Sequence, residues 1–230
     1  TIVFIGAGNI DKMASNFTRD LWLSGARLCS KERDFGDRVR SFLLPQTLLE
    51  SNYLLGNKTT IGIGGPVHWY AEPASIEDLK LLLRGAALSD IPFFIIGRGS
   101  NLLVSDKGYE GLVIRLSDSC WKEIKIEPDG IVLVGSGARL KEIAGQTAAA
   151  GLDGFAFLEG IPGTLGGALR MNAGAMSDSI FNRVESITWV SPDGEIHTQP
   201  RAYFNASYRD CPELHGAVII SAVLKASGFA

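Results

Sequence analysis

Glycine is gathered into four short clusters in this 230-residue chain, and these clusters limit what the chain can fold into more than any other feature. The chain holds 27 glycines, a share well above the roughly 7% of an average protein. The clusters lie at residues 6–8, 62–65, 97–101 and 160–174. Because glycine has no Cβ atom, such clusters favour tight turns and close approach of the backbone to a ligand.

Glycine clusters of this kind suggest a nucleotide ligand, but the two best-known nucleotide motifs are incomplete here. The Rossmann fingerprint requires GxGxxG between a strand and a helix, because each of the three glycines has its own steric role. Three GxG pairs are present, and they have Asp11, Leu102 and Leu140 where the third glycine is required. No glycine run ends in the Gly-Lys-Ser/Thr of a P-loop. The sequence therefore disfavours both motifs.

The cluster at residues 97–101 reads Gly-Arg-Gly-Ser-Asn and follows an apolar run. Its two glycines would let the backbone approach a diphosphate without a Cβ clash, and its serine and asparagine would add side-chain donors. Its arginine would offset anionic charge if the side chain pointed inward. The alternative is a tight β-turn in which serine and asparagine satisfy only their own backbone. This cluster alone leaves both interpretations open.

The longest cluster lies within residues 158–175, which read LEGIPGTLGGALRMNAGA and carry almost no charge. A plain turn does not need so long a segment. Its backbone could lie against a large flat ligand, with hydrogen bonds from Thr164, Asn172 and nearby amides. The alternative is a packing segment where two subdomains touch.

Composition and charge exclude several classes of protein. The net charge is −3, with both signs mixed along the chain, which argues against a nucleic-acid binder. No run of about 18 apolar residues exists, and the first residues lack a basic region and a cleavage site, so we expect no membrane association and no secretory signal. Cys29, Cys120 and Cys211 are too scattered for a disulfide framework or a zinc site. A cytoplasmic protein without a bound metal is expected.

Beyond residue 57 the chain alternates between short apolar strands, glycine turns and helices, which predicts an α+β domain. Ser75 is expected to cap the first helix of this domain. The expected elements are strands within residues 67–73, 92–104, 111–116 and 216–226, a helix at 75–88, a strand–turn–helix unit at 131–152 and a hairpin at 184–200.

Four strings, KTTIGIGGP, IIGRGSNLLVSD, GIPGTLGGALRMNAGA and SYRDC, resemble the UDP-N-acetylenolpyruvoylglucosamine reductase family in their order and spacing. The resemblance covers about residues 30–226, and the third string is the most specific. It implies an α+β FAD-binding domain of the vanillyl-alcohol oxidase/PCMH type with two subdomains. Other branches of that fold often hold FAD covalently through a histidine beside the glycine turn. No histidine lies near residues 97–101, so FAD is expected to bind non-covalently.

The resemblance also assigns roles to individual residues. Those that match the loop around the FAD pyrophosphate are Gly97, Arg98, Gly99, Ser100, Asn101 and Leu102. Those that match the walls around the flavin are Gly160, Ile161, Pro162, Gly163, Thr164, Gly167, Met171, Asn172, Ala173 and Gly174. Arg209 matches the active-site arginine of the family, and Tyr208 beside it is similar to a substrate-side tyrosine. Without the resemblance, Arg209 reads as a surface arginine paired with Asp210 or Glu213.

The activity that the resemblance implies is NADPH-dependent reduction of UDP-N-acetylglucosamine enolpyruvate to UDP-N-acetylmuramate, in peptidoglycan precursor synthesis. NADPH would reduce FAD, and the UDP-sugar enolpyruvyl ether would then take a hydride from the flavin and a proton from an acid. Hydride delivery pushes negative charge onto the substrate carboxylate, which the Arg209 guanidinium could stabilise. The alternative is an FAD- or nucleotide-binding module without turnover.

The resemblance also predicts how the chain is divided. Residues 1–26, read as a strand, a glycine turn and a helix, resemble the end of UDP-N-acetylmuramate–alanine ligase, which suggests a piece of a ligase–reductase fusion. Residues 27–56 are expected to form a linker and a first helix, and residues 57–226 the FAD-binding domain, with subdomains at about 57–117 and 118–226. The family continues into a substrate-binding domain with a serine proton donor and a glutamate acid, and we expect that domain to be absent here.

Overall fold

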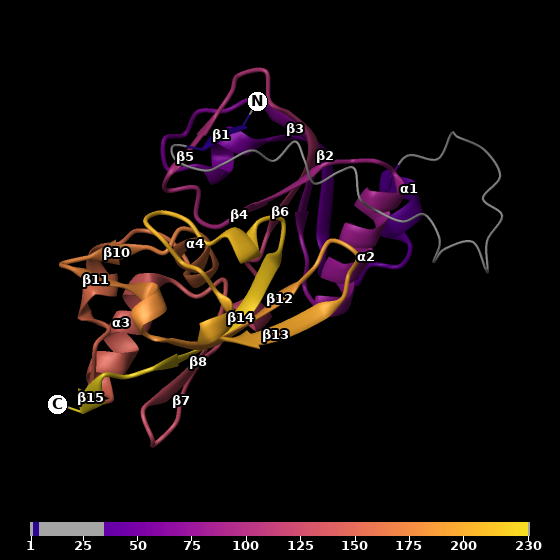
Figure 1. The fold of residues 1–230 in the computed structure, drawn as a ribbon. Coiled ribbons are helices and arrows are strands. Elements are labelled where there is room, and N and C mark those ends of the chain that lie inside the picture. The colour runs from indigo at the N-terminus through magenta and orange to yellow at the C-terminus, as the bar shows by residue number, and fades with distance from the viewer. Residues whose placement is uncertain (1, 5–34, 230) are drawn as a thin grey trace.

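The computed structural model describes residues 2–4 and 35–229 of the protein, and these residues form two lobes (Figure 1). The first lobe holds a four-stranded sheet and two helices, and the second holds a five-stranded sheet and two helices. The helix predicted at residues 11–25 lies outside the described residues. The two lobes lie one above the other in Figure 1, and the chain passes from the upper to the lower lobe once, after β6.

The sheet of the first lobe has the strand order β2-β3-β6-β4. Strands β2 and β3 are antiparallel, whereas β6 runs parallel to both β3 and β4. The elements of this lobe are α1 (Phe35–Arg40), β2 (Leu48–Leu54), β3 (Pro66–Glu72), α2 (Ile76–Leu88), β4 (Phe93–Ile96), β5 (Leu102–Val104) and β6 (Tyr109–Arg115). Strand β5 lies outside this sheet and pairs with β1 (Ile2–Phe4).

Helix α2 covers one face of the first sheet and gives this lobe its main core. It begins after Ser75, whose hydroxyl accepts the backbone N–H of Asp78, as the sequence predicts. Its Leu79, Leu82 and Leu83 are fully buried at the spacing of one helix face. Burial of each leucine contributes roughly 1.5–3 kcal/mol. The same core includes residues of β12 and β14, so it also joins the two lobes.

The sheet of the second lobe is antiparallel throughout, with the strand order β13-β12-β14-β8-β7. Its strands are β7 (Ile124–Ile126), β8 (Ile131–Gly135), β12 (Val184–Val190), β13 (Ile196–Pro200) and β14 (Val218–Lys225). Helices α3 (Leu140–Ala149) and α4 (Leu165–Arg170) belong to this lobe. Two short pairs complete it: β9 (Leu152–Asp153) with β15 (Gly228–Phe229), and β10 (Gly174–Ala175) with β11 (Asp178–Ser179).

The predicted α+β class with two subdomains is confirmed, and so are the strands, helices and hairpin predicted beyond residue 57. Two elements differ from expectation. Strand β2 lies where a linker and first helix were predicted, because pairing with β3 and burial of Leu49 outweigh the helical rhythm. Helix α4 lies inside the long glycine cluster, and no helix was predicted there because glycine disfavours helix interiors.

In the part of the chain that the structure describes, no helix has the length and apolar character needed to cross a bilayer. Those residues also contain no group of three or more His, Cys, Asp or Glu side chains that could hold a metal ion.

Candidate functional site

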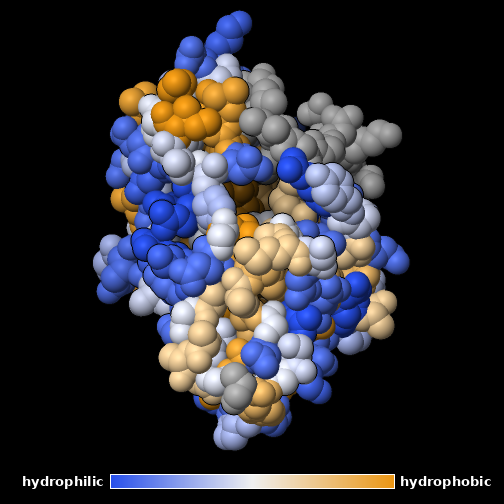
Figure 2. Space-filling model, turned by 90° about the vertical axis from the view of Figure 1, so that its left-hand side faces the viewer, coloured by the Kyte–Doolittle hydropathy of each residue, from blue (hydrophilic) through white to orange (hydrophobic). Residues whose placement is uncertain are grey.

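A cleft of about 1760 Å³ runs between the two lobes. Figure 2 shows the surface hollowed there, with hydrophobic residues in its depth. The first lobe contributes β4, the turn after it and the end of α2, and the second contributes α4, the segments beside it and the loop before β14. The cleft is larger than the 300–1,000 Å³ or so typical of small-molecule pockets, so it can hold a ligand of dinucleotide size.

The turn at residues 97–101 is packed tightly against two other segments. A Cβ on Gly97 would lie 2.7 Å from the Thr164 hydroxyl, and a Cβ on Gly99 would lie 2.4 Å from the Lys58 carbonyl oxygen. Gly99 also has φ +64°, in the left-handed region that favours glycine. The turn is held from outside as well, because the Thr60 N–H donates to the Gly99 carbonyl over 3.0 Å.

The two glycine clusters singled out by the sequence meet at the cleft. The Ser100 hydroxyl donates to the Pro162 carbonyl oxygen over 3.1 Å, although 62 residues separate them. In the second cluster, the Leu165 and Gly166 N–H groups donate to the carbonyls of Ala138 and Ser136. The turn after β4, the segment that leads into α4 and the turn after β8 therefore form one continuous surface from both lobes.

Ser136 is a candidate ligand-binding residue that sequence reasoning missed. Its side chain lines the cleft and is 3% exposed, and its hydroxyl has no hydrogen-bond partner among the described residues. A buried polar group without a partner is costly, so such a hydroxyl fits a ligand that would supply the missing bond. The available signal is the Gly135-Ser136-Gly137 turn between a strand and a helix, which as a sequence pattern is only an incomplete Rossmann motif.

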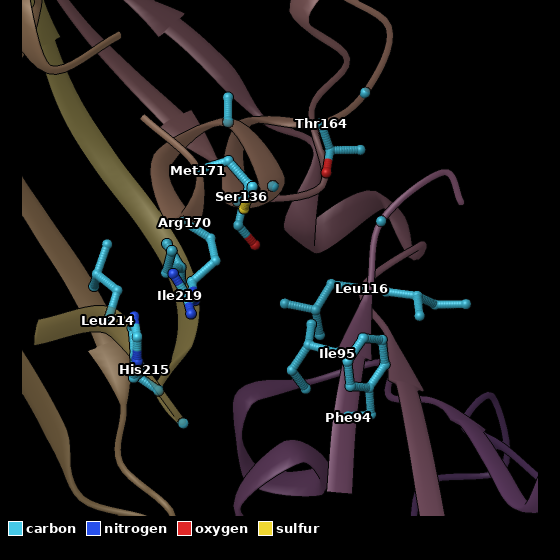
Figure 3. Close-up of a pocket in the computed structure, with 18 of the residues that line it drawn as sticks. Phe94, Ile95, Leu116, Ser136, Thr164, Arg170, Met171, Leu214, His215 and Ile219 are labelled. Carbon is cyan, nitrogen blue, oxygen red and sulfur yellow. The ribbon is translucent and has the colours of Figure 1, made fainter. Parts of the chain in front are cut away.

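Apolar side chains form the walls farther into the cleft. Figure 3 shows Phe94, Ile95 and Leu116 on one side, and Leu214 and Ile219 on the other. Leu116 and Ile219 are 8% and 6% exposed, so they present only a small apolar surface to the cavity. Walls of this kind suit a flat ring system, while the glycine turns suit a charged, hydrogen-bonding portion of the same ligand.

Nearly all predicted site residues line this one cleft. The cleft residues among them are Gly97, Arg98, Gly99, Ser100, Asn101, Leu102, Ile161, Pro162, Gly163, Thr164, Gly167, Met171, Asn172, Ala173, Gly174, Tyr208 and Arg209. Gly160 does not line it and is exposed at the end of a short 3₁₀ segment, Ala156–Gly160. The roles assigned to these residues by resemblance remain predictions.

Tyr208 and Arg209 form an exposed tip at the edge of the cleft. Tyr208 is 86% exposed, and the Arg209 guanidinium carbon lies 5.5 Å from the centre of the Tyr208 ring. The carboxylates proposed as surface partners of Arg209 have other contacts: Asp210 pairs with Arg170, and Glu213 accepts hydrogen bonds from Asn205. An exposed guanidinium beside a large cleft is placed to meet an anionic ligand.

Cys211 comes directly after this tip but is unsuited to nucleophilic chemistry. Its side chain is fully buried, and its Sγ lies 3.5 Å from a Glu213 carboxylate oxygen. Burial, together with the smaller effects of the Glu213 hydrogen bond and charge, raises the pKa of the Cys211 thiol to about 12. The thiolate is therefore disfavoured at neutral pH, in agreement with the sequence interpretation of a small packed residue.

Curated relatives are similar to this chain over most of its described length. It is 44% identical over 185 residues to the UDP-N-acetylenolpyruvoylglucosamine reductase of Prochlorococcus marinus, which covers 79% of this chain and 63% of that protein. It is 38% identical to the enzyme of the same name from Clostridium tetani, over 78% of this chain and 58% of that protein. The chain thus spans about three fifths of the length of these relatives. The predicted resemblance to this reductase family is confirmed, whereas a fusion to a ligase stays a prediction.

Solved structures share the fold. UDP-N-acetylenolpyruvylglucosamine reductase from Thermus caldophilus superposes with a TM-score of 0.68 at 30% identity, over 80% of this chain and 64% of that one. A glucose dehydrogenase, Phl p 4.0202, superposes with a TM-score of 0.63 at 14% identity, over 84% of this chain and 44% of that one, which shows the fold alone. A family model described as FAD binding domain matches residues 67–199, more than half of the chain. This chain therefore belongs to the FAD binding domain family.

Proposed function

We propose that this protein is a flavoenzyme that reduces UDP-N-acetylglucosamine enolpyruvate to UDP-N-acetylmuramate, with NADPH as hydride donor. The names of its relatives and its FAD binding domain support this assignment. The observation that carries it is the arrangement of the cleft, where two glycine clusters meet at one end and an exposed arginine stands at the edge. We assign the reaction to the cytoplasm, in keeping with cysteines that form no disulfide framework.

The residues of the cleft fit FAD. The turn at residues 97–101 would hold the pyrophosphate through backbone amides, Ser100 and Asn101, and the segment around α4 would flank the flavin. The unpartnered Ser136 hydroxyl, the apolar walls and the open space beside Gly167 support this fit. Bound FAD supplies hydride transfer chemistry, and this chain's residues position the reactants and exclude water.

Arg209 is the residue that we propose for the chemical step. Its guanidinium carries a permanent positive charge and paired N–H donors. Hydride addition to the enolpyruvyl double bond shifts negative charge toward the substrate carboxylate, and a fixed guanidinium stabilises this charge more than it stabilises the starting substrate. Tyr208 would contact the substrate beside it, since both side chains project from the same exposed turn.

A second candidate for these 230 residues is FAD binding without turnover. It is supported by the match to about three fifths of each relative's length, because the substrate site of a relative could draw on residues outside the matched part. The two candidates make the same prediction for FAD binding, and they differ in whether reduced FAD passes its hydride to the substrate.

The experiment is a visible absorption spectrum of the purified protein with FAD, taken before and after NADPH is added under nitrogen. Both candidates predict a flavin spectrum, and the reductase also predicts bleaching by NADPH. Subsequent addition of UDP-N-acetylglucosamine enolpyruvate should restore the oxidised spectrum if the reductase is correct. A spectrum that stays bleached with substrate favours the binding module, and failure to take up FAD contradicts both.

An arginine pair makes the test residue-specific. Arg209→Ala should keep FAD bound and bleached by NADPH, while reoxidation by the substrate slows by a factor of about 10² or more, as expected when an electrostatic stabiliser is lost. Arg40→Ala removes an exposed arginine at the end of α1, far along the chain from the cleft residues, and should behave as wild type. Equal reoxidation rates in the two variants would return Arg209 to a surface role.

A further inference from the structure

The Tyr208–Arg209 tip is the top of a tight turn that is closed by its two flanking residues. The Ser207 N–H donates to the Asp210 carbonyl over 2.9 Å, and the Asp210 N–H donates back to the Ser207 carbonyl over 3.3 Å. Arg209 has φ +57°, a left-handed conformation in an arginine. Such a residue costs on the order of 1–2 kcal/mol and persists only when its surroundings hold it.

The surroundings that hold the turn come from the segment around α4 on the other wall. The Asn172 side-chain amide donates to the Ser207 carbonyl over 3.0 Å. Arg170 Nη1 donates to Asp210 Oδ1 over 2.9 Å, which ties the other end of the turn to the last residue of α4. Both flanks of the turn are therefore fixed to residues of the predicted flavin wall.

Asp210 also binds a residue that lies beyond the turn. His215 Nε2 lies 2.6 Å from the same Asp210 oxygen that Arg170 binds. Figure 3 shows Arg170 and His215 close together on one wall of the cleft. Burial alone would raise the pKa of the Asp210 carboxyl, but the hydrogen bonds and charges of His215 and Arg170 hold it below its ordinary value. The carboxylate is thus ionised and directed inward at neutral pH, while its neighbour Arg209 stays exposed.

We propose that Asp210 is a positioning residue: it locks the Ser207–Asp210 turn between Arg170 of the flavin wall and His215, so that the Arg209 guanidinium is presented at the cleft in a fixed conformation. The importance of that presentation for substrate binding rests on the proposed function of Arg209. The locking of the turn does not rest on it, because the contacts are made within this chain.

The first arm of the test measures the turn itself. Trypsin cleaves after arginine, and a locked turn resists cleavage until it opens locally. The rate of cleavage after Arg209 is measured in the protein and in a synthetic peptide of residues 203–215 with the same sequence, and their ratio gives the protection. We expect Asp210→Asn and Arg170→Gln each to lower the protection on the order of tenfold, because each removes a charged hydrogen bond.

Asp178→Asn is the matched control for this arm. Asp178 accepts a hydrogen bond from Arg183 over 3.2 Å, another partly buried aspartate–arginine pair of the same lobe, with no contact to the turn. Its protection at Arg209 should equal that of wild type. Equal protection in Asp210→Asn and wild type would overturn the proposal, whatever the activity of the protein.

The second arm asks whether Asp210 acts through Arg209, which a general structural role would not require. The affinity of the FAD-loaded protein for UDP-N-acetylglucosamine enolpyruvate is measured from the perturbation of the flavin absorbance in a double-mutant cycle. Asp210→Asn should weaken this affinity on the order of tenfold when Arg209 is present and leave it unchanged in Arg209→Ala, with FAD affinity preserved throughout. Equal weakening in both backgrounds would overturn a role through Arg209. If wild type fails to bind this substrate at all, the proposed function fails and the trypsin arm still decides the proposal.

Discussion

The two glycine clusters at the cleft use glycine for opposite reasons. In the turn at residues 97–101 a side chain has no room, because a Cβ on Gly97 or Gly99 would fall within 2.7 Å of neighbouring protein atoms. In the second cluster a Cβ on Gly160 would have no heavy atom within 4 Å, and one on Gly167 would have only the Thr164 hydroxyl at 4.0 Å. A crowded glycine is required by the fold, whereas an open glycine at the cleft leaves room for something that is not protein.

The largest effect should come from filling the crowded cluster. Gly99→Ala forces a Cβ toward the Lys58 carbonyl oxygen at a residue with φ +64°, and together these should cost about 3 kcal/mol of folding free energy. For a protein of this size that corresponds to a fall in Tm of roughly 6–12 °C, measured by circular dichroism without ligand. A Tm within about 1 °C of wild type would contradict the crowding.

Gly145→Ala is the control for this substitution. Gly145 lies in α3 with no heavy atom near its Cβ position and an ordinary φ. Alanine there should raise stability by about 0.5–1 kcal/mol, because glycine is unfavourable in a helix interior. The two substitutions should therefore move the Tm in opposite directions.

Filling the open cluster should leave the fold intact and affect the ligand. Gly167→Ala adds a methyl group to the cleft within α4, so the Tm without ligand should hold or rise slightly. If the flavin lies against this surface, the methyl group should weaken FAD binding by about tenfold, measured by quenching of FAD fluorescence. Gly160→Ala is the comparison, since Gly160 is equally open but does not line the cleft.

The outcome of this pair decides which open glycine matters. Weakening in Gly167→Ala alone would place the flavin at the α4 wall and remove Gly160 from the predicted binding residues. Weakening in both would restore Gly160 to the site. Unchanged affinity in both would mean that the open space beside α4 is not occupied by FAD.

Ser136→Ala should have opposite signs without and with the ligand. Without FAD it removes a buried hydroxyl that has no partner among the described residues, which should be neutral or slightly stabilising. With FAD it removes one hydrogen bond, worth about 1 kcal/mol, so affinity should fall by about fivefold. Thermal shifts measured with and without FAD test both signs at once, and a loss of stability without FAD would show that the hydroxyl already has a partner.

Local sequence patterns identified both glycine clusters and the arginine tip, because turns and short motifs are encoded by adjacent residues. They could not identify Ser136 as a cleft residue, since its exposure to the cleft depends on α4 packing against the turn after β8. Strand β2 was missed for a similar reason, because its extended form depends on pairing with β3. Nor could the sequence show that Asp210 binds Arg170, forty residues away, rather than Arg209 beside it.

The smallest expected effect concerns acid, and it sharpens the contrast between the clusters. Lys58, whose carbonyl oxygen bounds Gly99, donates through its Nζ to Glu72 over 2.9 Å. Burial alone would raise the pKa of Glu72, but hydrogen bonds from Ser117, Tyr70 and Lys58 hold it below the ordinary value of about 4.3. A lowered folded-state pKa means that the stabilisation is fully present above about pH 4.3 and is lost as the pH falls through the folded-state value.

We therefore expect the urea midpoint of wild type to fall between about pH 5 and about pH 3, and Glu72→Gln to remove part of that fall. Glu142→Gln, which changes an exposed carboxylate of α3, should leave the pH dependence as in wild type. Cleavage of the first lobe's loops by pepsin should rise over the same range in wild type, because the Glu72 network holds Lys58 against the crowded turn. If Glu72→Gln and wild type lost stability in parallel, the crowded turn would owe its rigidity to packing around Gly99 alone.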